Sequence, residues 1–159
     1  MIIFFTIFVL VLFIFIAGTL SGLETDYYTE KKDIMRIFSS FLSDIKVDKT
    51  DQKIDPINIE NTQNNILYFS KRLIKIQKLY IYNKKIKKDF DKDEQEKKYI
   101  IEITKLFMDG LNDWLKYHKT ELEQLTSNLG NQEKNTKNID FKSAIELQKK
   151  RIEIHTSKI

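Results

Sequence analysis

The chain has 159 residues, a net charge of +4 at pH 7 and no cysteine. The lack of cysteine excludes disulfides, thiolate zinc sites and a cysteine nucleophile. One proline and four glycines are too few turn formers for many short strands, so the composition predicts an all-α chain of long helices.

The N-terminal segment, residues 1–23, reads MIIFFTIFVLVLFIFIAGTLSGL and carries no charged side chain. About 20 apolar residues span a bilayer, whereas the apolar region of a cleaved signal has roughly 7–15 residues and usually follows a basic residue. The segment therefore predicts a retained single-pass transmembrane anchor. Because Thr19 to Ser21 form a weak small-x-small site, the alternative is cleavage near Ser21 and release as a secreted or surface-exposed helical binding protein.

Charge asymmetry predicts the orientation of this anchor. No lysine or arginine precedes the segment, while Lys31, Lys32 and Arg36 follow it closely. The positive-inside rule then places the N-terminus outside and the remainder on the cytoplasmic side, or on the equivalent side of an organelle membrane.

Gly18 and Gly22 form a G-x-x-x-G pattern at the end of the segment. Small residues at this spacing allow two membrane helices to approach closely, which predicts a helix-packing site and allows a homodimer. The alternative interpretation is a bend where the chain leaves the membrane.

Residues 24–159 are expected to form one helical bundle domain. Residues 29–46 carry apolar side chains at alternating spacings of three and four, which is typical of an amphipathic helix. A long connection is predicted at 47–62 because this segment holds Pro56 and lacks a helical period, although Ile57 and Ile59 could pack against the bundle.

Three further helices complete the predicted domain. The second runs from Thr62 or Asn64 to about Lys88, with a broad apolar face that indicates contact with more than one neighbour. The third begins at Asp91 and ends before Gly130. A polar loop at 131–139 precedes a last helix from Asp140. The apolar stripe of the third helix has a period of about 3.6, which favours an antiparallel bundle of three to four helices over a coiled coil. That stripe consists of Ile100, Ile103, Phe107, Leu111, Trp114, His118, Leu122, Leu125 and Leu129.

The sequence offers no convincing catalytic, metal or cofactor site. Asp89, Asp91 and Asp93 begin like a calcium loop, but Glu94 replaces its glycine and Ile100 replaces its bidentate glutamate, so an acidic helix start is the preferred interpretation. His118 has Trp114 and Leu122 as its i±4 neighbours and is expected to be partly buried in the bundle. No phosphate-binding loop or G-x-S-x-G motif occurs, and we predict a non-enzymatic protein without a cofactor.

Lysine is dense near the end of the second helix, at Lys84, Lys85, Lys87 and Lys88. The first interpretation is a solvated face. The second is an anionic lipid surface or an acidic protein partner, and nucleic acid is the least favoured partner.

These features predict a membrane-anchored accessory or assembly subunit whose bundle binds a larger membrane protein complex. Its docking surface is expected on the second and third helices, at any exposed part of Ile74, Ile81, Leu106 and Trp114. The layout resembles that of the peripheral-stalk b subunits of rotary ATP synthases and of phage inner-membrane spanins. No motif residue matches either family, and no family is assigned.

Overall fold

The computed structural model describes residues 2–45, 56–86, 94–120 and 132–159. These residues form four long helices and no strand, so the all-α prediction is confirmed for the part of the chain that the structure describes. The helices are α1 (Ile2–Ile45), α2 (Pro56–Ile86), α3 (Glu94–Tyr117) and α5 (Gln132–Thr156).

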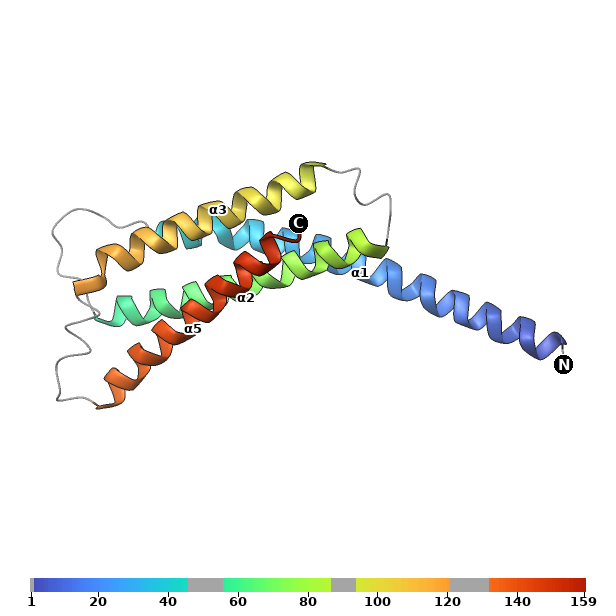
Figure 1. Cartoon of the computed structure of the whole chain (residues 1–159), viewed down its shortest axis with the longest axis horizontal. Coiled ribbons are helices and arrows are strands. Elements are labelled where there is room, and N and C mark those ends of the chain that lie inside the picture. The colour runs from blue at the N-terminus through green and yellow to red at the C-terminus, as the bar shows by residue number, and fades with distance from the viewer. Residues whose placement is uncertain (1, 46–55, 87–93, 121–131) are drawn as a thin grey trace.

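Helix α1 is unbroken from the apolar segment into the rest of the protein. Its 44 residues give a length of about 66 Å at 1.5 Å per residue. Every described side chain between Ile7 and Gly22 is exposed, and partial burial begins at Leu23. The helix therefore has a projecting N-terminal half and a half that contacts the remaining helices, as Figure 1 shows.

Among the described residues, α1 alone is long and apolar enough to cross a membrane, judged by length and composition. None of its most apolar window is buried against the rest of the protein. A bend near Gly22 was the alternative interpretation of the glycine pair, but the helix continues through this residue.

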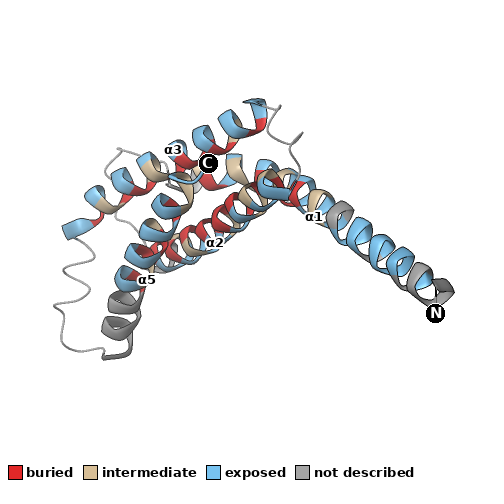
Figure 2. Ribbon diagram, turned by 45° about the vertical axis from the view of Figure 1, so that its right-hand side comes forward, coloured by how far each residue is buried: buried red, intermediate tan, exposed pale blue. Residues whose placement is uncertain are grey.

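The described residues from 24 onward, called the body below, are arranged around α2. Helix α2 contacts α1 and α5 extensively, and α3 lies against α1, α2 and α5. Consecutive helices run in opposite directions along the body (Figure 1). Figure 2 shows that the buried residues follow the inner faces of these helices and are absent from the projecting half of α1.

Aromatic rings fill the centre of the body. Phe41 of α1 and Phe107 of α3 stack on Phe69 of α2, with ring centroids 4.4 and 5.4 Å away from that of Phe69. Phe38 also stacks on Phe69, with ring centroids 5.5 Å apart. The predicted apolar stripes supply this core. The buried stripe residues are Ile34, Phe41, Ile66, Phe69, Leu73, Ile76, Tyr80, Ile100, Ile103, Phe107, Leu111, Trp114, Phe141, Ile145 and Ile152.

The predicted connection at 47–62 is wrong in its second half, because α2 begins at Pro56. Proline lacks only an amide hydrogen that the first helical position does not use, and its fixed φ suits that position. Ile59 and Gln63 are both 6% exposed, so this added start of the helix is packed against the body.

The predicted loop at 131–139 is also wrong, since α5 begins at Gln132 rather than at Asp140. Leu147 of this helix is 50% exposed and does not belong to the core. Helix α3 ends at Tyr117, and the predicted continuation through 121–129 lies outside the described residues, as does the predicted start at Asp91.

Candidate functional site

A buried carboxylate joins α1 to α2 shortly after the apolar segment ends. The Glu30 side chain is 2% exposed, and its Oε2 lies 2.7 Å from Lys75 Nζ. Its Oε1 lies 2.7 Å from Arg72 Nε, an ion pair without hydrogen-bond alignment. Arg72 Nη2 also donates a hydrogen bond of 2.7 Å to Asp33 Oδ2. Two cations of α2 thus neutralise two carboxylates on one face of α1.

A second buried carboxylate joins α1 to α3 at a similar level. The Tyr27 hydroxyl donates a 2.5 Å hydrogen bond to Glu96 Oε2, and Lys31 Nζ donates one of 2.5 Å to Glu96 Oε1. Lys31 Nζ also lies 4.9 Å from the centre of the Tyr99 ring, a distance suited to a cation–π contact. Burial, followed by the nearby Glu96 charge, raises the pKa of Tyr99 to about 12. The Tyr99 hydroxyl has no hydrogen-bond partner among the described residues.

Gln77 links α2 to the two later helices. Its side chain is fully buried, and Nε2 donates to Thr104 Oγ1 of α3 at 3.2 Å and to Thr156 Oγ1 of α5 at 3.0 Å. The Glu30 ion pairs and the Gln77 hydrogen bonds fix the register of α2 against α1, α3 and α5, because an unpaired buried polar group costs free energy. The Glu96 contacts fix the register of α3 against α1 in the same way. Because these buried polar side chains pair mainly with one another, we assign them a structural role.

The end of α2 lies beside the end of the apolar segment. Asn83 is 2% exposed, and its Nδ2 donates to the backbone oxygen of Leu23 at 3.2 Å and to that of Leu79 at 2.9 Å. The next residues, Lys84 and Lys85, occupy the last turn of α2. Lys87 and Lys88 of the predicted lysine cluster lie outside the described residues.

The four residues predicted to dock a partner are divided by the fold. Ile74 and Trp114 are 7% and 3% exposed and belong to the core, so little of either side chain remains for a partner. Ile81 is partly buried against the same core, whereas Leu106 is 44% exposed. Leu106 is therefore the most exposed of the four predicted docking residues.

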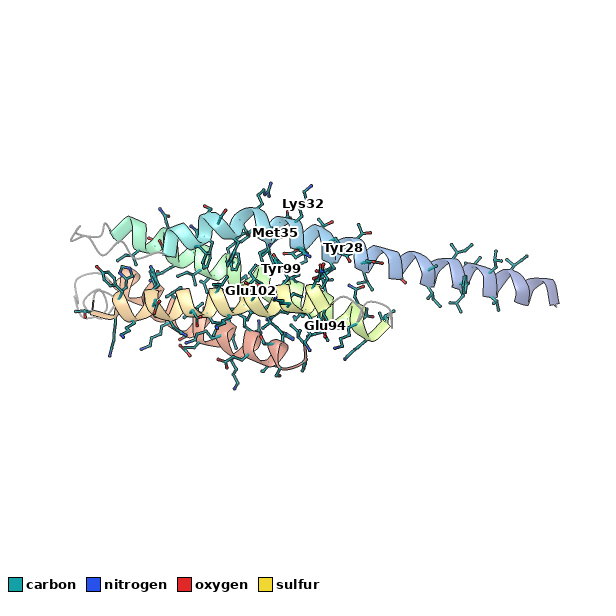
Figure 3. All side chains as sticks on the ribbon, turned by 90° about the horizontal axis from the view of Figure 1, so that it is seen from above. Tyr28, Lys32, Met35, Glu94, Tyr99 and Glu102 are labelled. Atoms are coloured by element: carbon teal, nitrogen blue, oxygen red, sulfur yellow. The ribbon has the colours of Figure 1, made fainter. Side chains whose placement is uncertain are left out.

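Further apolar side chains are exposed along the edge where α1 and α3 meet. Figure 3 shows Tyr28, Lys32 and Met35 of α1 opposite Tyr99 and Glu102 of α3. Tyr28 and Met35 are 44% and 58% exposed. The sequence analysis did not identify either as a candidate docking residue. Met35 interrupts the polar face of its amphipathic helix, and an apolar residue at such a position could have indicated a docking site.

The glycine pair lies on the projecting half of α1. Gly18 and Gly22 are exposed, and a Cβ atom added at either would meet no heavy atom within 4 Å. Packing of the body therefore does not require glycine at either position.

The structure places His118 in the core, beside two aromatic rings. His118 is 5% exposed, with its ring 4.8 Å from Trp114 and 5.0 Å from Tyr117 between centroids. Within the described ranges, no three His, Cys, Asp or Glu side chains come close enough together to hold a metal ion. The predicted calcium-like residues Asp89, Asp91 and Asp93 lie outside those ranges.

Comparison with known proteins gives no relative from which a function could be transferred. No family model matches the chain, and no curated protein or solved structure matches it either. The features of this chain that can indicate a function are therefore the projecting apolar helix, the exposed edge between α1 and α3, and the end of α2.

Proposed function

We propose that the chain is a non-enzymatic accessory or assembly subunit, anchored in a membrane by the first half of α1. Its body, a helical bundle of antiparallel neighbours, binds a larger membrane protein complex. The observation that carries this proposal is the continuity of α1, which joins an exposed, uncharged apolar segment to a packed amphipathic one.

The dimensions of the projecting segment support an anchor. Residues 2–23 extend about 33 Å as a helix, close to the roughly 30 Å of a bilayer hydrocarbon core. Lys31, Lys32 and Arg36 follow the segment, which favours the body on the cytoplasmic or equivalent organellar side. Tyr28, 44% exposed, suits the membrane–water interface.

The edge between α1 and α3 is the surface that we propose for the protein partner. Met35 exposes apolar surface there that the body does not bury, and Lys32 and Glu102 give it charged flanks. Leu106 is 44% exposed and follows Glu102 by one helical turn, which puts the two residues on one face of α3. A surface with an apolar centre and charged flanks is typical of protein interfaces. Because this edge continues the line of the anchor, a partner in the same membrane can reach it.

A photo-crosslinking experiment tests this function. A photoreactive residue replaces Leu106 in one variant and Leu147 in a matched control, since both are exposed leucines and Leu147 lies on α5. After crosslinking in native membranes and gentle detergent extraction, we expect Leu106 to yield one stoichiometric membrane protein adduct that Leu147 does not yield. Recovery of the protein alone, or identical adducts from both positions, would contradict the proposal.

The second candidate is a secreted or surface-exposed binding protein released by cleavage near Ser21. It is favoured by the position of the exposed apolar segment near the N-terminus, which a signal sequence shares. Sequencing of the mature N-terminus separates the two functions. Intact Met1 in the membrane fraction excludes cleavage, and a new N-terminus near Ser21 or Gly22 excludes the anchor.

A further inference from the structure

The last turn of α2 is held at the level where the proposed membrane segment ends. The hydrogen bond from Asn83 Nδ2 to the Leu23 backbone oxygen joins the two helices at this level. Figure 1 shows the C-terminal end of α2 beside α1, at the place where α1 leaves the body. If residues up to Leu23 lie in the bilayer, this turn lies among lipid headgroups, whose layer is about 5–8 Å thick on each side.

The side chains of this turn match that environment. Tyr82 and Ile86 are 52% and 38% exposed, and Lys84 and Lys85 stand between them in the chain. Tyrosine favours the headgroup region because its ring is amphipathic, and lysine is attracted to anionic headgroups. Glu24 and Asp26 follow Leu23 closely on α1 and are repelled by an anionic surface, so the lysines of α2 supply the attraction near this level.

We propose that Tyr82, Lys84, Lys85 and Ile86, called the α2 tip, dock on the anionic lipid surface of the membrane that α1 crosses. This inference rests on the proposed membrane anchor and adds a second attachment point to it. The anchor alone lets α1 tilt and rotate about its own axis in the bilayer, whereas a docked tip fixes which side of the body faces the lipid.

Because the chain has no cysteine, single-cysteine variants of the full-length protein can test this directly. A fluorophore at Ile86→Cys reports on the α2 tip, and one at Val9→Cys reports on the anchor. Each protein is reconstituted in vesicles of phosphatidylcholine, with or without phosphatidylserine. Nitroxide lipids then quench the fluorophore from the headgroups or from the acyl chains.

The Val9 label separates the two proposals. We expect acyl-chain nitroxides to quench it in both kinds of vesicle, and lack of quenching would overturn the anchor and the docking together. With Val9 quenched, we expect headgroup nitroxides to quench the Ile86 label severalfold more when phosphatidylserine is present. Equal quenching in the two lipid mixtures would overturn the docking alone.

Charge reversal tests the role of the lysines. Each lysine near an anionic surface contributes about fivefold to association, so Lys84→Glu with Lys85→Glu should reduce Ile86 quenching to the level seen in phosphatidylcholine. The matched pair Lys116→Glu and Lys142→Glu, on exposed sites of α3 and α5, should leave it unchanged. Equal effects of the two pairs would contradict the proposal. Salt at about 1 M shortens the Debye length to roughly 3 Å and should likewise lower the quenching of the unaltered α2 tip to the level seen in phosphatidylcholine.

Discussion

Glu30 is the side chain whose loss should cost the body most among its charged groups. Only 2% of it is exposed, and it forms ion pairs with both Arg72 and Lys75. Glu30→Gln would leave these cations facing an amide, and Arg72 is itself only 21% exposed. We expect the free energy of unfolding to fall by about 2–3 kcal/mol, below the full cost of a broken buried pair because Lys75 can turn to solvent. Chemical denaturation of the full chain in detergent, followed by circular dichroism, measures this change.

Asp33 provides a matched control for Glu30, because it pairs with the same arginine but is 39% exposed. A solvated ion pair contributes little, so Asp33→Asn should cost less than about 1 kcal/mol. Similar losses for Glu30→Gln and Asp33→Asn would show that burial does not decide the strength of these pairs.

His155 makes the stability of the body depend on pH. Burial, with Lys78, Lys158 and Arg151 nearby, lowers the pKa of His155 below its usual 6.5. The unfolded chain therefore binds this proton at a higher pH than the folded chain does. The contribution of His155 is fully present above pH 6.5 and is lost as the pH falls through the lowered pKa. The melting temperature should drop between about pH 7.5 and pH 5.5, the range in which histidine titrates, and we expect His155→Gln to make this drop smaller. An unchanged drop would assign the pH dependence to other groups.

Single residues show what sequence reasoning can and cannot predict. Ile100, Phe107 and Trp114 were predicted as one stripe, and all are buried, because helical spacing alone decides which residues share a face. The pair Arg72–Asp33 spans 39 positions and was not predicted. Such a pair depends on how far α1 slides along α2, and no local pattern encodes that register.

At the scale of a helix, two predicted starts came too late in the chain, those of α2 and α5. The start of α5 was missed because residues 132–139, QEKNTKNI, have too few apolar side chains to display a helical period. Pro56 was interpreted as part of a connection, although proline also occupies first helical positions. In both cases the helix extends beyond the pattern that predicted it.

The glycine pair of α1 can be tested separately from the body. Gly18 and Gly22 are exposed, and added Cβ atoms there meet nothing within 4 Å. We therefore expect the double variant Gly18→Leu with Gly22→Leu to fold normally in detergent. Its free energy of unfolding should be unchanged or higher by up to about 1 kcal/mol per glycine, because leucine favours a helix more than glycine does. A marked loss of stability would mean that the folded chain needs these glycines.

The same double variant also tests helix packing. If two copies of α1 associate through the small faces of Gly18 and Gly22, bulky leucines keep them apart. Crosslinking in bilayers should then show a dimer for the unaltered chain and none for the variant. A dimer that persists in the variant would exclude this glycine pair as the contact.

For the whole molecule, the expected outcome is a fixed orientation across the membrane. Lys142 is exposed on α5, and the chain has no other cysteine to compete with Lys142→Cys. A membrane-impermeant maleimide should modify this cysteine only after the cytoplasmic side is opened, because the positive-inside rule places the body there. Modification in intact cells would reverse the proposed orientation, and the cysteine-free chain serves as the blank.

The unbroken course of α1 has a mechanical consequence for an anchored protein. Residues 24–45 extend the helix about 33 Å beyond the apolar segment, with no joint between the two parts. A tilt of about 20°, which membrane helices commonly adopt, moves the far end of such a lever by about 11 Å. Because tilt responds to bilayer thickness, a thinner membrane would swing the distal end of the body, and the subunit would convert lipid composition into displacement.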